Sequence, residues 1–158
     1  MAKLTTLKLN HFRNCEQAHL SFAPKLNLLI GDNAAGKTSV IESLWFLVSG
    51  RSFRSSKVNA LIQHSHEQFI VFAEMIEESG LQHKVGLQKS LSQSILKLDD
   101  QKLSSHAEVA RTLPIQMLTP ESHKLLEEGP KARRQFIDWG CFYQNLSLFS
   151  IGDIFKER

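Results

Sequence analysis

Eight consecutive residues have the clearest chemical meaning in this sequence: Gly31-Asp32-Asn33-Ala34-Ala35-Gly36-Lys37-Thr38. They match G-x-x-x-x-G-K-[ST], a loop whose backbone N–H groups surround a phosphate. We expect all eight to bind a nucleotide, with Lys37 reaching the β- and γ-phosphates and the Thr38 hydroxyl ligating Mg²⁺. The composition of the chain gives a chance match of roughly 4 in 1,000. The spacing therefore predicts a site for ATP with Mg²⁺.

The residues around this loop predict the strand–loop–helix order that phosphate binding requires. The apolar run at 26–30 stops at Gly31, which predicts a short buried strand. From Lys37 onward, apolar residues recur at helical spacing, and Gly50 is a typical helix stop. The N-terminus of that helix would add its dipole and its free N–H groups to the phosphate site.

The rest of the chain predicts mainly antiparallel sheet, followed by helices. Further strands are expected at 3–9, 21–22, 69–76, 84–89, 94–98 and 113–118, with a turn at 99–102. Helices are expected from Ser104 or Ser105 to Arg111, at 119–128 and at 131–138. We divide the chain into a P-loop core (1–60), a mostly antiparallel β segment (61–112) and a strand and helical segment (113–158).

Length and composition exclude several classes of protein. The chain has 158 residues, 42% hydrophobic and 22% charged, which suits one folded domain and excludes wholesale disorder. No apolar run approaches a membrane span, and the first residues lack the apolar core of a secretory signal. Cys15 and Cys141 fit no disulfide or metal framework, so we expect a reducing, cytoplasmic location. The seven histidines show no zinc-binding pattern.

The formal charge of +3 is unevenly distributed. Residues 1–60 carry eight Lys/Arg against three Asp/Glu, residues 61–128 six against ten, and residues 129–158 five against three. A basic first segment is compatible with a polyanionic partner. An unevenly charged, solvated surface explains the same numbers, so charge alone does not decide the question.

Four motifs occur in one order: F-R-N at 12–14, the phosphate loop, G-R-S-F-R at 50–54 and G-P-x-x-R-R-x-F-x-D at 129–138. Together they resemble the RecF family of bacterial recombination mediators, from Lys3 to the end of the chain. The resemblance implies an α/β P-loop NTPase fold like a lobe of an ABC-type ATPase head, with a mixed sheet, an antiparallel β subdomain and flanking helices. The family loop often carries glycine where Ala34 stands. If that position needs positive φ, alanine costs about 1 kcal/mol there.

A head of this kind also needs a Walker B aspartate with a neighbouring carboxylate, and a signature motif from a second protomer. In the family these lie in a later part of a longer chain. Asp99-Asp100 follows a short apolar stretch, but we interpret this pair as a hairpin turn. We therefore interpret the chain as an N-terminal part with an incomplete fold, assign no catalytic residue, and expect no hydrolysis by this chain alone.

The resemblance also suggests roles for residues outside the loop. It implies that Arg13 contacts nucleotide phosphates, although a surface charge on a tight turn is the alternative. Gln116 resembles the Q-loop position of ABC-type ATPases, or it is a polar strand residue. Arg51, Arg54 and Lys57 form a basic cluster that either contacts DNA or is merely solvated.

The function implied by the resemblance is ATP- and DNA-binding recombination mediation. The full-length protein would dimerise with ATP, bind single-stranded, double-stranded and junction DNA, and hydrolyse ATP slowly. With RecR and RecO it would load recombinase during gap repair, at stalled replication forks and in the SOS response. An SMC-like structural head and a P-loop small-molecule kinase are the alternatives. The F-R-N motif and the antiparallel middle argue against a kinase.

Overall fold

The computed structural model describes residues 2–118, Pro130 and Arg134. The chain divides into two compact units, Met1–Ile115 and Gln116–Arg158. The elements named below all lie in the first unit. In the described part of the chain, no helix is both long enough and apolar enough to cross a membrane.

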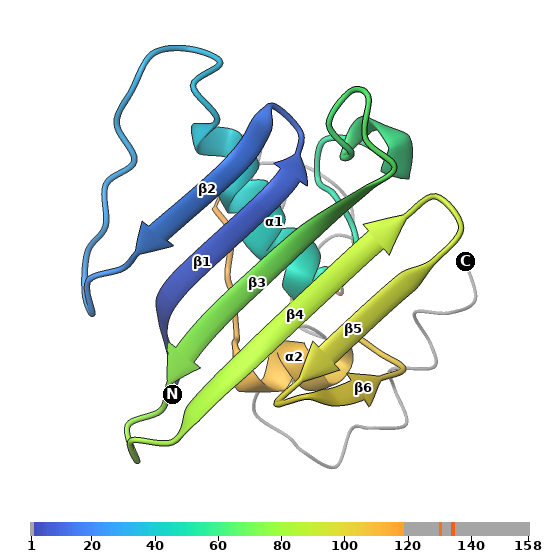
Figure 1. Cartoon of the computed structure of the whole chain (residues 1–158). Helices are drawn as coiled ribbons and strands as arrows, with labels where there is room; N and C mark the ends of the chain where they lie inside the picture. The colour runs from blue at the N-terminus through green and yellow to red at the C-terminus, as the bar shows by residue number, and fades with distance from the viewer. Residues whose placement is uncertain (1, 119–129, 131–133, 135–158) are drawn as a thin grey trace. The chain divides into compact units, whose positions relative to one another are not determined.

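Six antiparallel strands form one sheet in the order β2-β1-β3-β4-β5-β6 (Figure 1). Their bounds are β1 Lys3–Phe12, β2 Cys15–Ser21, β3 Gln68–Ile76, β4 Gln82–Ser90, β5 Ser94–Leu98 and β6 Gln101–Leu103. Burial alternates along β3, where every second residue from Phe69 to Met75 is buried. This period of two confirms the predicted antiparallel middle of the chain.

Both α-helices lie on the same face of this sheet, behind the strands in Figure 1. They are α1 (Lys37–Ser49) and α2 (Ala107–Thr112), and a short 3-10 helix, η1, spans Val58–Ala60. Gly50 ends α1 in the left-handed region at φ 68°, and its N–H donates to the Phe46 carbonyl. At the other helix, Ser105 Oγ accepts a hydrogen bond from the Ala107 N–H at 3.1 Å. The predicted start of α1 at Lys37 and its stop at Gly50 are therefore confirmed, whereas the N-cap position of α2 is His106 and not Ser104 or Ser105, and this helix runs one residue past Arg111, to Thr112.

Three phenylalanines pack α1 against the sheet. The Phe69 ring meets Phe12 at 5.0 Å and Phe46 at 5.5 Å between centroids, both edge to face. All three side chains are buried. The ring of His106 joins the same cluster, and its Nδ1 bonds the Leu47 carbonyl at 2.8 Å. Burial lowers the pKa of His106, which keeps this ring neutral as α2 packs on α1.

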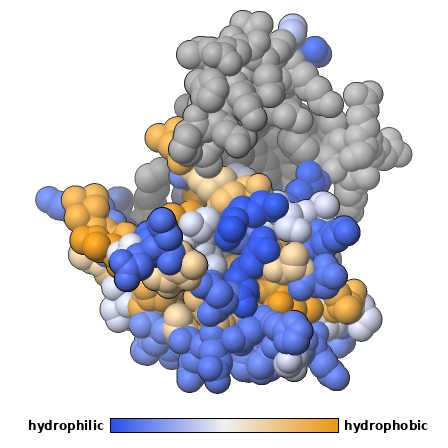
Figure 2. Space-filling model, turned by 90° about the horizontal axis from the view of Figure 1, so that it is seen from above, coloured by the Kyte–Doolittle hydropathy of each residue, from blue (hydrophilic) through white to orange (hydrophobic). Residues whose placement is uncertain are grey.

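The strand predicted at 26–30 is wrong. These residues form no helix or strand, and Leu26, Leu28 and Ile30 are 74%, 73% and 89% exposed. An extended segment becomes a strand only when a neighbour satisfies its backbone groups, and no described strand pairs with this one. In Figure 1 the segment loops away from the sheet between β2 and α1, and Figure 2 shows a group of apolar atoms on that side.

The strand predicted at 113–118 is also wrong, because these residues form neither helix nor strand. Pro114 lacks a backbone donor, and no described strand lies in register with the segment. The helices predicted at 119–128 and 131–138 lie outside the described residues, apart from Arg134, which is helical like Pro130. The hairpin turn is confirmed at Asp99 and Asp100, which have φ 48° and 67° and join β5 to β6, but Gln101 and Lys102, also predicted to belong to this turn, lie in β6.

A histidine between two carboxylates makes stability depend on pH. His83 Nδ1 lies 2.6 Å from Asp99 and its Nε2 3.2 Å from Glu77. The hydrogen bond to Asp99 raises the pKa of His83 against partial burial, and Glu77 adds to this rise. For Asp99, burial opposes ionisation, but hydrogen bonds from His83 and the Lys84 N–H lower its pKa.

We predict that this cluster stabilises the fold most between about pH 4 and about pH 6.5. A raised histidine pKa contributes stability that is lost as pH rises through the folded value. A lowered aspartate pKa contributes stability that is lost as pH falls through its folded value. Thermal unfolding midpoints of the wild type and His83→Gln should therefore differ more at about pH 5.5 than at about pH 8. His19→Gln, at an exposed position of β2, is the control. A difference that does not change with pH would contradict this prediction.

Candidate nucleotide-binding site

The phosphate loop enters α1 in the conformation that its sequence predicts. Gly36 immediately precedes the helix at φ 94°, and Lys37 is the first helical residue. Ala34 has φ 65°, so this position does need positive φ and the alanine is strained. The Lys37 ammonium donates to the carbonyls of Gly31 and Asp32 at 2.7 Å each. The cation is thus held against the loop backbone.

The turn between β1 and β2 supports the loop from one side. Asn14 Nδ2 donates to the Ala34 carbonyl at 2.6 Å, and Asn14 Oδ1 accepts from Ser39 Oγ at 2.8 Å. A Cβ on Gly36 would lie 3.0 Å from Cys15 Sγ, so glycine is needed there for close approach as well as for its φ. Burial raises the pKa of the Cys15 thiol, which favours a protonated packing residue.

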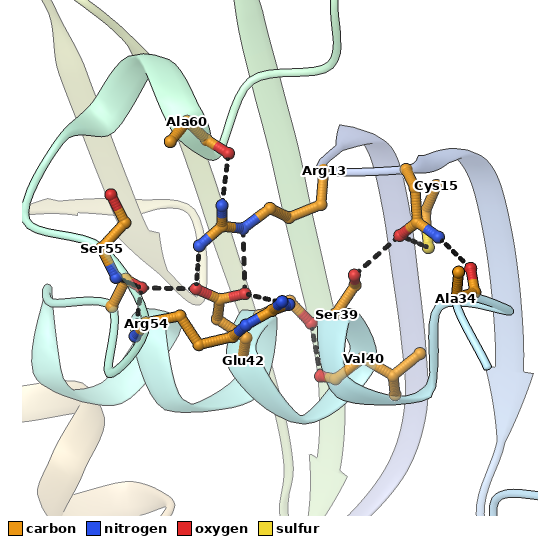
Figure 3. A network of polar contacts seen from close by, with 12 residues as sticks. Arg13, Cys15, Ala34, Ser39, Val40, Glu42, Arg54, Ser55 and Ala60 are labelled. Atoms are coloured by element: carbon orange, nitrogen blue, oxygen red, sulfur yellow. Dashed lines mark hydrogen bonds and ion pairs between the residues drawn. The ribbon is translucent and has the colours of Figure 1, made fainter.

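A buried carboxylate organises the other side of the site (Figure 3). The Glu42 side chain, on α1, is 0% exposed. Arg13 bonds it with two nitrogens, Nε to Oε2 at 3.0 Å and Nη2 to Oε1 at 2.6 Å. Ser52 Oγ also donates to Oε1, and Arg54 Nη1 lies 3.7 Å from Oε2. Two arginines therefore share one carboxylate, as expected for a charge removed from water.

Arg13 is more than a solvated charge on a turn. Its side chain is 17% exposed, and its Nη1 donates to the Ala60 carbonyl at 2.7 Å, beyond its two bonds to Glu42. Its backbone has φ 58°, in the tight connection from β1 to β2. The guanidinium therefore ties this connection to α1 and to η1.

Arg13, Asn14, Ser39 and Arg54 line one pocket of about 510 Å³, together with the loop from Asn33 to Thr38. Arg13, Lys37 and Arg54 bring three cations to it, and its described lining contains no carboxylate. Such a pocket suits an anionic ligand of the size of a nucleotide. Thr38 is exposed at the helix start. One hydroxyl oxygen fits Mg²⁺, which keeps waters and takes its other ligands from phosphates.

The remaining predicted residues are not all brought to this pocket. Arg51, Arg54 and Lys57 are exposed, but Arg54 turns toward Glu42 and the phosphate loop. Arg51 lines a second hollow of about 500 Å³ with Phe53, and Arg54 borders both. Gln116 belongs to the second unit and lies outside helices and strands. No group of three or more potential metal ligands from His, Cys, Asp and Glu occurs among residues 2–118, 130 and 134.

Sequence reasoning missed four residues that shape the site: Asn14, Ser39, Glu42 and Ser52. A signal for part of this set is present in the sequence. Ser39, Glu42 and Ser43 recur at spacings of three and four, which places polar groups on one side of an otherwise apolar helix. All three are buried. A buried carboxylate requires a cationic partner, and in the structure Arg13 and Arg54 supply it.

The chain is similar to known proteins along most of its length. Residues 3–147 match the family model for the RecF/RecN/SMC N terminal domain. The DNA replication and repair protein RecF of Hydrogenovibrio crunogenus is 51% identical over 151 residues, which are 96% of this chain and 41% of that protein. RecF of Proteus mirabilis is 41% identical over 93% of this chain and 41% of its own length. The chain thus spans 41% of the length of these relatives.

Solved structures agree with this assignment. The recombination mediator protein RecF-ATP, of the RecFOR pathway, has a TM-score of 0.81 at 28% identity over 94% of this chain and 40% of its own. A solved SMC ATPase structure is 17% identical to this chain and has a TM-score of 0.71. The match covers 87% of this chain and 98% of that one, which shows the same fold. The expected ATPase-head lobe is confirmed, and the chain belongs to the RecF/RecN/SMC N-terminal domain family.

Proposed function

We propose that the protein carrying this chain is an ATP- and DNA-binding recombination mediator. The observation that carries this proposal is a phosphate loop already held in shape beside a pocket with three cations. Similarity to RecF at 51% identity supports it and favours a mediator over an SMC-like structural head. By the same similarity, the full-length protein would act in the cytoplasm in gap repair and SOS induction, with RecR and RecO as partners.

Each residue of the pocket has a role in this proposal. The N–H groups of residues 31–36 surround the phosphates, and Lys37 moves its ammonium from the loop carbonyls to the β- and γ-phosphates. Mg²⁺, held by Thr38, would neutralise charge on those phosphates. Arg13 adds a fixed positive charge from its position on Glu42. Gln116 is proposed as a nucleotide-binding residue only by its resemblance to the Q-loop position.

DNA contacts are proposed for Arg51, Arg54 and Lys57. Arg54 belongs to both proposed sites, because it lines the phosphate-loop pocket and is also part of the exposed 51–57 segment. The P-loop core (1–60) and the antiparallel segment (61–112) would act as one lobe, since β1 and β3 pair within the same sheet. The remaining segment (113–158) would complete this part of the head.

Removal of the Lys37 ammonium tests ATP binding. We expect Lys37→Ala to weaken affinity of the full-length protein for ATP with Mg²⁺ by about 10- to 100-fold, the range for hydrogen bonds to charged groups. Titration with a fluorescent ATP analogue measures this loss. Lys25→Ala removes an equal charge at an exposed position outside the loop and serves as the control. A Lys37→Ala protein that binds ATP as tightly as the wild type would contradict the proposal.

The contact between Asn14 and Ala34 gives a second test. Left-handed backbone costs alanine about 1 kcal/mol, and the Asn14 hydrogen bond holds Ala34 in that conformation. Glycine adopts the same φ without this cost. The loss of ATP affinity caused by Asn14→Ala should therefore be about fivefold larger with alanine at position 34 than in an Ala34→Gly background.

The four proteins of this double-mutant cycle are compared by ATP titration, with thermal midpoints as a check on folding. Additive effects of the two substitutions would show that Asn14 does not compensate for strain at Ala34.

The buried carboxylate gives a test of stability. Glu42→Ala leaves the Arg13 guanidinium largely buried without its anion, so we expect a loss of about 3 kcal/mol or more in free energy of unfolding. Denaturant titration of the full-length protein measures it. Glu16→Ala, at an exposed position of β2, is the control and should change stability little. Equal costs for the two substitutions would show that the Arg13–Glu42 pair does not hold the site together.

A further inference from the structure

The sheet has a second face, turned away from α1 and α2 and toward the viewer in Figure 1. The strand registers place one residue from each strand in a single line across this face: His19, Lys8, Phe72, Gly86, Lys97 and Lys102. We call this line the outer row. Neighbouring strands lie about 4.8 Å apart, so the row extends for about 24 Å.

This face is strongly basic. Lys8, Lys97 and Lys102 belong to the outer row, and the registers place Lys3 and Lys84 on the same face. All five lysines are exposed. Among the paired residues of this face in the described strands, Glu74 is the one acid. Mixed charges are the norm on a merely solvated surface, whereas this excess complements a polyanion.

The middle of the outer row is aromatic. Phe72 is half-buried, and the Lys8 ammonium lies 5.6 Å from its ring centroid. Gly86, its neighbour on β4, has no side chain, and a Cβ there would lie only within ordinary contact of the ring, 3.9 Å from Cδ2. A side chain at position 86 would touch the ring, so the glycine leaves that edge of Phe72 uncovered by its neighbour on β4.

We propose that the outer row binds single-stranded nucleic acid, with Lys8, Lys97 and Lys102 at phosphates and Phe72 against a base. Aromatic rings between basic residues bind single strands because unpaired bases expose their faces, whereas duplex bases are already stacked. The inference rests on the proposed DNA-binding function. It adds a surface distinct from the 51–57 segment, which contacts Glu42 of α1 on the opposite face.

The lysines are tested by the salt dependence of binding. The full-length protein is titrated with a fluorescent oligothymidylate of about 15 nucleotides at several salt concentrations. Each phosphate contact contributes about 0.7 to the slope of log affinity against log salt. We expect Lys97→Gln to reduce the slope by about 0.7, and Lys97→Gln with Lys102→Gln by about 1.4.

Lys25→Gln removes one charge at an exposed position away from the sheet and is the matched control. Its slope should equal that of the wild type. Equal effects of Lys25→Gln and Lys97→Gln would overturn the proposal, because they would show only a response to net charge. Lys97 and Lys102 point outward from β5 and β6, so these variants are expected to keep their thermal midpoints.

The aromatic contact is tested by Phe72→Leu, which keeps an apolar side chain but removes the ring. We expect affinity for the single strand to fall about tenfold, and affinity for a duplex of equal length to stay within about twofold. An equal loss for both DNAs would overturn single-strand recognition. A wild type that binds neither DNA would overturn the proposed function itself. Wild-type binding that no row variant changes would overturn the outer row alone.

Discussion

The structure of the site depends on one carboxylate that has no contact with water. Glu42 is fully buried in α1, and an ionised group in such a position is tolerated only with cationic and hydrogen-bonding partners. Arg13 comes to it from the β1–β2 connection, and Ser52 and Arg54 come from the segment after α1. Ser52 Oγ in turn accepts hydrogen bonds from the Arg54 and Ser55 N–H groups. The need to neutralise one charge on α1 therefore brings the β1–β2 connection and the segment after α1 together beside the phosphate loop.

In the phosphate loop, an unfavourable backbone conformation is offset by a hydrogen bond from a residue distant in sequence. Positive φ at Ala34 is unfavourable for alanine, but the Asn14 amide holds the carbonyl of that residue in place. Asn14 and Arg13 are adjacent in the same connection, so one short turn supports both the loop and the carboxylate of α1. This preorganisation reduces the ordering that a bound phosphate would otherwise require.

Local patterns were sufficient to predict some of this architecture. The phosphate loop, the start of α1 at Lys37 and its end at Gly50 are encoded by neighbouring residues, and the alternation along β3 is equally local. The error at 26–30 has a different origin. Leu26, Leu28 and Ile30 have the composition of a buried strand, but a strand also depends on a hydrogen-bonded neighbour that residues 26–30 do not specify. The pairing of Glu42 with Arg13 could not be predicted for a similar reason, since the two residues lie 29 apart in sequence.

The register of the strands determines where the charged side chains of the sheet lie. Lys8, Lys97 and Lys102 are far apart in sequence, and the middle of the chain has an acidic balance. Strand pairing nevertheless places these lysines in one line, while the acids that the structure describes in that region are mostly in turns and at strand ends. β1 carries Lys8 on the outer face and leads directly into Arg13 and Asn14 at the phosphate loop. A single paired strand thus joins the surface proposed for nucleic acid to the turn that shapes the nucleotide site. Because β1 is hydrogen-bonded on both sides, an altered position of that turn would displace the neighbouring strands as well.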